Sequence, residues 1–338
     1  MTAGILSTPL DGTATGSRRR RLRSRAIVGL LEGLGWVLRR LPEPLLHRVA
    51  HRLGGLLHLV QRRRRQLVRR NLARVCRWLS EEGIAGPAVA RAARDEAALD
   101  GLVRDAFGHY VRSYLESLLV ERYTGSRLEA RLTADDPALV EQLFGHAGEG
   151  NRSSLVLVGL HYGAIEIPGL WASRHGIRLT SPMETIDDPE LQAFIQRRRA
   201  ASGLTLIPLA GAHRVLADRL AAGESVALVA DRLVAGSGAR VELFGSPARL
   251  PIGPAVLALE SGRPAWAVAV RRTGAGEYRA RLEPIELPAA GTRRERLAGF
   301  MANQARAFER LVADAPEQWW TLFFPIWERR GATPKGRP

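Results

Sequence analysis

The spacing of hydrophobic residues changes near residue 150. Before it, apolar residues recur at steps of three and four, as on one face of an α-helix, most regularly over residues 102–118. After it, short runs rich in valine and leucine alternate with helical patterns. The sequence therefore predicts a disordered basic leader over 1–25, a helical region over 26–150 and a different kind of domain over 151–330.

Strands and helices alternate in the last region. Buried strands are predicted at 154–160, 204–210, 225–231 and 265–270, with helices at 189–202, 212–222 and 254–261. Strands that are apolar on both faces and joined through helices form parallel sheets covered on both sides. The expected fold is α/β, with a mostly parallel central sheet flanked by helices and an N-terminal amphipathic helical extension.

Three other segments complete the predicted domain. Runs at 241–245 and 278–285 alternate apolar and polar residues, which is typical of antiparallel or edge strands. Residues 293–316 predict a closing helix. The segment 236–254 is rich in glycine and proline, and both a mobile flap and a rigid hairpin loop fit that composition.

Two apolar stripes precede the predicted domain, one from Ile27 to Leu41 and one from Leu45 to Val60. The first continuous apolar stretch, "AIVGLLEGLGWVL", contains Glu32 and is shorter than the roughly 20 apolar residues that a membrane-spanning helix needs. No small-residue cleavage motif follows it, so no removable signal peptide is predicted. We expect amphipathic helices that do not cross a bilayer.

The same segment holds the basic charge. Residues 17–77 contain eighteen arginines against Glu32 and Glu43, which accounts for the whole formal charge of +16. Apolar stripes rimmed by arginine bind anionic membrane surfaces, which is the partner we expect. There are two alternatives: the stripes pack on the main domain, or the arginines bind nucleic acid. No aromatic stacking platform accompanies the charge, so we expect no nucleic-acid partner.

Residue counts exclude several kinds of chemistry. Lys335 is the only lysine, which excludes a phosphate-binding loop ending in Gly-Lys-Ser/Thr and Schiff-base catalysis. The single cysteine, Cys76, excludes a disulfide framework and a cysteine-rich metal site. The histidines do not recur at ligand spacing with carboxylates or sulfur, so we expect no metal.

A candidate site interrupts the first predicted strand of the domain, in "LVLVGLHYGAIEIPGLW" (155–171). His161 follows the strand, and Glu166 falls on the first turn of the next helix. Reactive groups of α/β folds lie where strands end. We expect Glu166 to accept a hydrogen bond from one ring nitrogen of His161, leaving the other to take a proton from a hydroxyl. A strand-end histidine and a helix-start carboxylate without catalytic roles are the alternative.

Further candidates lie at another strand end. Asp231 closes the strand predicted at 225–231, and Arg232 follows it, which favours both as site groups over surface charges. A structural Asp–Arg pair is the alternative. The chain has no Gly-x-Ser-x-Gly motif, which argues against a serine hydrolase.

The order of these blocks resembles the lysophospholipid acyltransferase superfamily, whose signature is a histidine, four residues, and Asp or Glu. The likeness is nearest to the branch of lipid A late acyltransferases and phosphatidylinositol mannoside acyltransferases. It covers most of the chain, through "RRRRQLVRRNLARV", "LVGLHYGAIEIPGL", "FIQRRRAASGLTLIPL", "VALVADRLVAGSGARVELFGSPARLPIGPAVLALESGRP" and "PEQWWTLFFPIW". The chain departs in "HYGAIE", where the family often has an Asn-Trp pair, and in "ADRL", where an acidic residue often follows Asp-Arg.

The resemblance implies a reaction. A fatty acyl chain would move from a thioester of coenzyme A or acyl carrier protein to a hydroxyl of a membrane glycolipid, and no cofactor would be needed. The likeness favours a phosphatidylinositol mannoside over lipid A as the acceptor, and implies a peripheral, monotopic enzyme on the cytoplasmic face of the plasma membrane. Residues 26–150 would then be the membrane-associating region and 151–330 the acyltransferase core.

It also implies residue roles. His161 would be the general base, and Glu166 would stabilise the imidazolium. Glu184 and Arg199 would contact the acceptor, and Glu242 would lie in a block that lines the cleft; as alternatives, Arg199 belongs to a solvated helix face and Glu242 to an edge strand. A catalytically idle protein that only binds anionic membranes is a different class of function, and the intact His161 and Glu166 argue against it.

Overall fold

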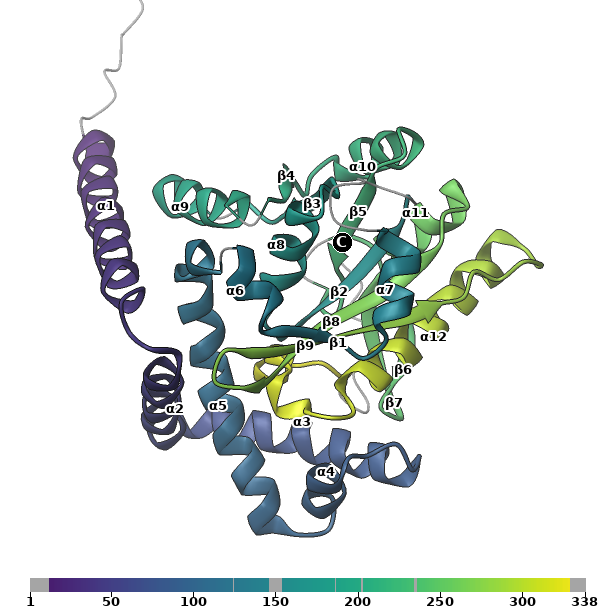
Figure 1. The fold of residues 1–338 in the computed structure, drawn as a ribbon, viewed down its shortest axis with the longest axis horizontal. Coiled ribbons are helices and arrows are strands. Elements are labelled where there is room, and N and C mark those ends of the chain that lie inside the picture. The colour runs from purple at the N-terminus through teal and green to yellow at the C-terminus, as the bar shows by residue number, and fades with distance from the viewer. Residues whose placement is uncertain are drawn as a thin grey trace, which may run out of the picture.

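A seven-stranded sheet forms the centre of the computed structural model, which describes residues 12–123, 125–145, 154–185, 187–201, 203–233 and 236–328, without the side chains of 12–21, 121 and 125 (Figure 1). Its strands in chain order are β1 (Leu132–Ala134), β2 (Val156–Gly163), β3 (Leu179–Met183), β4 (Thr205–Pro208), β5 (Ser225–Val229), β8 (Ala265–Gly274) and β9 (Glu277–Ile285). The spatial order is β1-β9-β8-β2-β5-β3-β4. Only β8 and β9 run antiparallel among these neighbours, so the predicted mostly parallel sheet is confirmed.

Helices cover the sheet and extend beyond it. Those described are α1 (Gly12–Leu38), α2 (Glu43–Val60), α3 (Arg62–Glu81), α4 (Pro87–Ala92), α5 (Glu96–Leu118), α6 (Gly125–Glu129), α7 (Pro137–Phe144), α8 (Ile167–Arg174), α9 (Pro189–Ala200), α10 (Ala212–Ala221), α11 (Gly253–Ser261) and α12 (Arg293–Val312). Short 3-10 turns lie at η1 (Val120–Arg122), η2 (Pro316–Gln318) and η3 (Trp320–Phe323). In Figure 1, α1–α5, purple to blue, stand together beside the sheet at the left and bottom of the view.

Local sequence signals explain several helix starts. The Asp188 carboxylate accepts from the backbone N–H groups of Glu190 and Leu191, and Pro189 occupies the first turn of α9. Thr292 and Glu295 form a reciprocal capping box at the start of α12. The helices predicted at 189–202, 212–222 and 254–261 are confirmed as α9, α10 and α11.

The boundaries of the predicted regions differ from those of the structure in two places. Helix α1 begins at Gly12, inside the segment predicted to be a disordered leader, and residues 1–11 of that leader lie outside the described residues. Strand β1 pairs with β9, so the central sheet takes in a strand from the region predicted to be helical. The segment 236–254 contains the antiparallel hairpin of β6 (Gly238–Leu243) and β7 (Ser246–Pro251), the second of the two forms that its composition fits.

The main hydrophobic core lies between the sheet and helices from both halves of the chain. Val156 and Val158 of β2 pack in one cluster with Val75 of α3, Phe107 of α5 and Phe308 of α12. Helices α3 and α5 therefore belong to the same packed body as the sheet. By contrast, α1 packs chiefly on α9 and α5, and α2 packs chiefly on α5.

Candidate active site

His161 lies near the carboxyl end of β2, in the middle of the sheet. Strand β5 runs parallel beside β2, with Gly159 opposite Val229. Two residues further along each strand, His161 therefore lies beside Asp231. Nδ1 of the His161 ring is 2.7 Å from Oδ1 of Asp231, and the His161 backbone N–H donates to Oδ2 at 3.0 Å.

The carboxylate of Asp231 is buried and fully hydrogen-bonded. Besides the two bonds from His161, its Oδ2 accepts from the Trp319 indole Nε1 at 2.8 Å and from the Thr321 hydroxyl at 2.6 Å. Burial by itself would raise the pKa of this carboxyl, but the His161 ring and the donors Thr321 and Trp319 outweigh it and lower the pKa to about 2. Asp231 is therefore ionised at neutral pH.

The ionised carboxylate fixes the chemistry of the His161 ring. Because a carboxylate only accepts, Nδ1 carries the proton of the neutral imidazole and Nε2 keeps its lone pair. The Trp320 ring packs edge-on against the imidazole, with centroids 4.7 Å apart. The side chain is 18% exposed, so the pair is partly open to solvent. This arrangement can remove a proton from a hydroxyl group and hold the resulting imidazolium.

Gly163 allows the chain to turn sharply after His161. Its φ of +54° is in the left-handed region, and a Cβ at this position would lie 2.0 Å from the Val270 carbonyl oxygen. The backbone N–H of Ala164 donates to that same oxygen at 2.8 Å. A side chain at residue 163 would therefore displace the turn that leads from His161 to α8.

Glu166 has other partners than the one predicted. Its Oε1 accepts from the Ser117 hydroxyl of α5 at 3.1 Å and lies 3.9 Å from Nε of Arg199 on α9. Among the described residues, the carboxylate that hydrogen-bonds the His161 ring is that of Asp231, not that of Glu166. Instead, Glu166 joins Arg199, a second predicted site residue, at the start of α8. Its predicted catalytic role stays a prediction.

Comparison with known proteins assigns the chain to a family. The profile described as bacterial lipid A biosynthesis acyltransferase matches residues 87–328, which include every predicted site residue. The chain belongs to this family. Its resemblance to the branch of lipid A and phosphatidylinositol mannoside acyltransferases is thereby confirmed, and the protein is an acyltransferase.

Two relatives carry a more specific name. The acyltransferase is 28% identical over 233 residues to a phosphatidylinositol mannoside acyltransferase of Mycolicibacterium smegmatis, covering 68% of this chain and 69% of the relative. It is 37% identical over 112 residues to a phosphatidylinositol mannoside acyltransferase of Mycobacterium tuberculosis, covering 32% of this chain and 35% of that relative.

The other predicted site residues of the acyltransferase lie in different surroundings. Glu184 is exposed and directly follows β3, whose carboxyl end points the same way as those of β2 and β5. Arg232 stacks its guanidinium 4.5 Å from the Phe324 ring centroid, and its buried Nε has no hydrogen-bond partner among the described residues. Glu242 is on the exposed face of β6, and its charge acts on Glu309 of α12.

Four residues around the site of the acyltransferase were not predicted: Trp319, Trp320, Thr321 and Ser117. The first three lie in "PEQWWTLFFPIW", a block that the family resemblance already included, so the signal was present without a role. Trp319 also bridges the backbone of Tyr162, which anchors this closing segment beside β2. Ser117 lies on α5, where the sequence indicates a helix but nothing that marks this serine as a site residue.

Proposed function

We propose that the protein is an O-acyltransferase that moves a fatty acyl chain from a thioester of coenzyme A or acyl carrier protein to a hydroxyl of a phosphatidylinositol mannoside. The observation that carries this proposal is the buried, ionised Asp231 bonded to Nδ1 of His161, which leaves Nε2 as a base. The names of the two mycobacterial relatives support the acceptor.

The reaction needs no protein nucleophile. Nε2 of His161 takes the proton of the acceptor hydroxyl while its oxygen attacks the thioester carbonyl carbon, and Asp231 stabilises the imidazolium. The tetrahedral oxyanion then collapses, its carbon–sulfur bond breaks, and the thiolate takes the proton from His161. The products are the acyl ester and a free thiol. Arg232, with its buried Nε lacking a partner among the described residues, is the proposed donor to the oxyanion.

The acceptor is proposed to lie toward Glu166, Arg199 and Glu184. A phosphatidylinositol mannoside carries a phosphate and many hydroxyls, which arginine and carboxylates recognise. Glu166, at the start of α8, lies 3.9 Å from Arg199 of α9, and Glu184 follows β3 at the same edge of the sheet. Glu242, on the β6–β7 hairpin, is proposed to line the rim of the cleft.

A lipid A-type acceptor is the second candidate, since the family profile is described as lipid A biosynthesis. The reaction and its base would be the same, and only the acceptor would differ. A catalytically idle membrane-binding protein is disfavoured because the His161–Asp231 pair is intact, with each Asp231 oxygen hydrogen-bonded.

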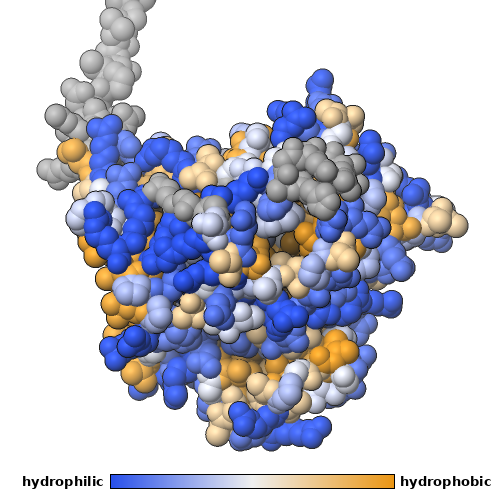
Figure 2. Space-filling model, in the orientation of Figure 1, coloured by the Kyte–Doolittle hydropathy of each residue, from blue (hydrophilic) through white to orange (hydrophobic). Residues whose placement is uncertain are grey.

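An exposed apolar surface on α1 and α2 supports a membrane location. The large hydrophobic side chains exposed there are Leu22, Ile27, Leu30, Leu34, Trp36, Val37, Leu45, Leu53, Leu56, Leu59 and Val60. We call this set the α1–α2 apolar face. Figure 2 shows orange residues gathered along the left margin below the grey segment, over these two helices, with blue residues beside them. Exposed apolar patches rimmed by charge mark membrane or protein contacts.

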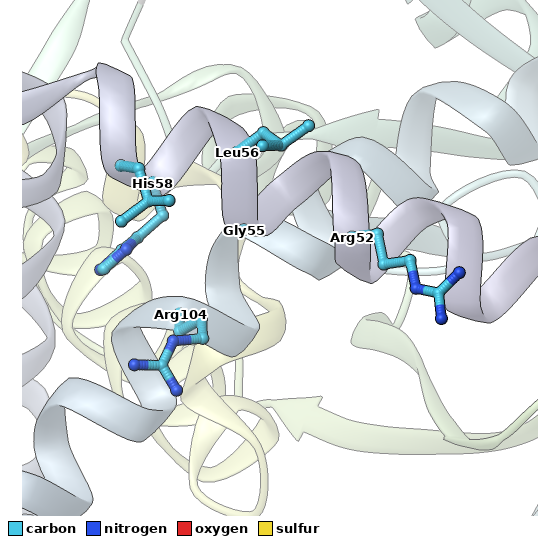
Figure 3. A pocket seen from close by; sticks show the side chains of 6 residues that line it. Arg52, Gly55, Leu56, His58 and Arg104 are labelled. Atoms are coloured by element: carbon cyan, nitrogen blue, oxygen red, sulfur yellow. The ribbon is translucent and has the colours of Figure 1, made fainter.

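A shallow hollow of about 500 Å³ opens on the same face, between α2 and α5. Its lining combines Gly55, Leu56 and Leu59 with the basic residues Arg52, His58 and Arg104; Figure 3 shows Arg52 on α2 and Arg104 on α5. Leucine side chains together with guanidinium groups suit an anionic lipid, because its acyl chain is apolar and its phosphate is negatively charged.

We therefore propose a peripheral, monotopic enzyme on the cytoplasmic, anionic face of the plasma membrane. Among the described residues, none of the helices combines the length and the apolar character needed to cross a bilayer.

The test is release of coenzyme A thiol from palmitoyl-coenzyme A by purified protein, with phosphatidylinositol mannosides and lipid A precursors as acceptors. His161→Ala should lower the acceptor-dependent rate by on the order of 10²–10⁴. His213→Ala, at an exposed histidine of α10, is the matched control. If no acceptor stimulates release, the assay is repeated with palmitoyl-acyl carrier protein, which decides between the two donors. If no acceptor stimulates thiol release from either donor, the proposed function is rejected.

A further inference from the structure

We propose that Arg272 is a positioning residue for the reaction: it holds the turn after His161 and the segment that binds Asp231 in one fixed relation. The inference rests on the proposed function, in which His161 is the base. Arg272 lies on β8, is buried, and touches neither His161 nor Asp231 in the described contacts. It contacts Gly163 and Gln318 instead, which neighbour the residues of the site.

The guanidinium of Arg272 holds the turn directly. Its Nη2 donates to the carbonyl oxygen of Gly163 at 2.8 Å, two residues after His161. Gly163 is the residue with the left-handed backbone, and its carbonyl orientation sets where the chain goes next. A charged donor to a carbonyl forms a stronger hydrogen bond than a neutral one. Arg272 thus fixes the end of the strand that carries the base.

The backbone of Arg272 holds the second segment. The Gln318 side chain accepts from the Arg272 N–H at 2.9 Å and donates to the Arg272 carbonyl at 2.8 Å. The next residue is Trp319, and Thr321 lies two residues further on; both donate to Asp231. One residue is therefore bonded to both segments that together define the position of the His161–Asp231 pair.

Helix α5 supplies the counter-charge that keeps Arg272 in place. Glu116 accepts from Nε of Arg272 at 3.0 and 3.1 Å and from its Nη2 at 2.6 Å, and the Ser113 hydroxyl accepts from the same Nη2 at 3.1 Å. Burial would raise the pKa of Glu116, but Arg272 and Arg112 outweigh it and the net pKa is lowered. Glu116 is therefore ionised and keeps the guanidinium of Arg272 in one orientation.

A second buried pair beside this one provides a control. Nη2 of Arg112 donates to Oε2 of Glu43 at 2.5 Å, and Nε of Arg112 donates to Glu116 at 2.9 Å. This pair has the same chemistry and burial as Arg272 and Glu116 but makes no described contact with Gly163 or Gln318. A purely structural role predicts the same consequences for losing either pair.

The test replaces each pair with apolar side chains of similar size, because such exchanges often leave stability unchanged or raise it, whereas removing one partner leaves a buried charge. Arg272→Met/Glu116→Leu is compared with Arg112→Met/Glu43→Leu, both in the full chain and both checked by thermal unfolding. In the acyltransferase assay, the first variant should lower kcat on the order of 10- to 100-fold with KM for the acyl donor changed less than about twofold. The second should keep the kcat of the unsubstituted protein.

Hydrogen–deuterium exchange gives a readout that does not depend on activity. In the first variant, peptides covering residues 161–170 lose the guanidinium bond to Gly163 and should exchange faster than in the unsubstituted protein. Peptides covering 316–323 should be affected less, because Gln318 binds the backbone of residue 272, which methionine keeps. In the second variant neither set should exchange faster. Equal kcat and exchange in the two variants would overturn the inference. If the unsubstituted protein transfers no acyl group, the proposed function falls, and the exchange comparison still decides whether Arg272 holds these segments.

Discussion

Asp231 and Glu166 are both buried carboxylates within reach of the site, but their hydrogen bonds assign them different tasks. Asp231 binds the His161 ring, and Glu166 binds Ser117 and lies near Arg199. A carboxylate that orients a general base must stay ionised and must fix the tautomer of the ring. Asp231 meets both conditions, which makes its charge testable separately from its shape.

Asp231→Asn should lower kcat on the order of 10²–10⁴ with the fold retained. Oδ2 accepts from His161 N–H, Trp319 and Thr321, so the amide oxygen of asparagine takes that place and its NH₂ faces Nδ1 of His161. The ring then accepts at Nδ1 and carries its proton on Nε2, which can no longer act as base. The measurement is acceptor-dependent thiol release together with a thermal unfolding curve.

Glu166→Gln is the isosteric comparison. Glutamine still accepts from Ser117 but attracts Arg199 less, so we expect a raised KM for the glycolipid acceptor and a fall in kcat of less than about tenfold. A loss of kcat as large as that of Asp231→Asn would show that Glu166, as the sequence pattern suggested, is the partner on which the base depends.

Glu309 predicts a pH dependence of stability. Burial, opposed by the Phe244 N–H and reinforced by the charge of Glu82, raises its pKa from 4.5 to about 7. The folded protein then holds a proton that the unfolded chain releases between these values, so stability falls as the pH rises from 4.5 to 7. Glu309→Gln keeps an acceptor for Phe244 and removes the titration. At pH 8 the variant should be more stable than the unsubstituted protein by at most about 3 kcal/mol and should melt at a higher temperature. At pH 4 the two melting temperatures should be equal. An equal difference at both pH values would contradict this origin.

The sequence identified His161 and Asp231 but not their pairing. Both follow predicted strands, and the carboxyl ends of parallel strands lie at one edge of a sheet. Which strands are neighbours, and in what register, depends on packing across the whole sheet. The register that sets Gly159 opposite Val229 places His161 beside Asp231, seventy positions away. Glu166 is five positions away, and this local spacing pointed to the wrong partner for the ring.

At the scale of elements, segments with a clear apolar or alternating pattern were predictable, and strands without such a pattern were not. Helices α9 to α12 and strands β2, β4, β5 and β8 match the predicted runs. Strand β3, "LTSPM", contains a proline and two hydroxyl side chains, and β1 has three residues, so neither shows a strong pattern. Both owe their conformation to pairing with neighbours that the sequence does not reveal.

The crossing of α2 and α5 gives a prediction about elements. A Cβ on Gly54 would lie 2.5 Å from the Gly108 backbone N, whereas a Cβ on Gly55 would meet nothing within 4 Å. Gly54→Ala should therefore push the helices apart and lower the free energy of unfolding. Gly55→Ala should stabilise α2 by up to about 1 kcal/mol, because alanine is the better helix former. Urea unfolding of both variants is the measurement, and equal effects would show that the two helices do not cross closely at Gly54.

At the scale of the molecule, α2 is apolar on two sides. Leu46, Ala50 and Gly54 are buried, while Leu53, Leu56 and Leu59 are exposed. The two possibilities left open by the sequence, packing on the domain and binding a membrane, are thus not exclusive. One side of the helix is packed on α5, and the other side is available to a bilayer.

Leu56→Asp/Leu59→Asp should lower binding to anionic phosphatidylglycerol vesicles at least about tenfold, since two leucines lose their contact with the acyl region and two negative charges face the lipid phosphates. Vesicle sedimentation measures the bound fraction. Val215→Asp, at an exposed apolar residue of α10, is the control and should bind like the unsubstituted protein. Unchanged binding by the double variant would place the membrane contact elsewhere.

The order in which these parts form has a consequence for the folding of the chain. The backbone hydrogen bonds of α1 and α2 join residues about four positions apart, whereas the bonds that hold Asp231 span 70, 88 and 90 positions. Contacts between distant residues cost more loop-closure entropy than local ones and slow folding. We therefore expect a folding chain to acquire affinity for the bilayer before it acquires a base, so the final steps of folding take place at the lipid surface, and lipid composition can influence how fast active enzyme appears.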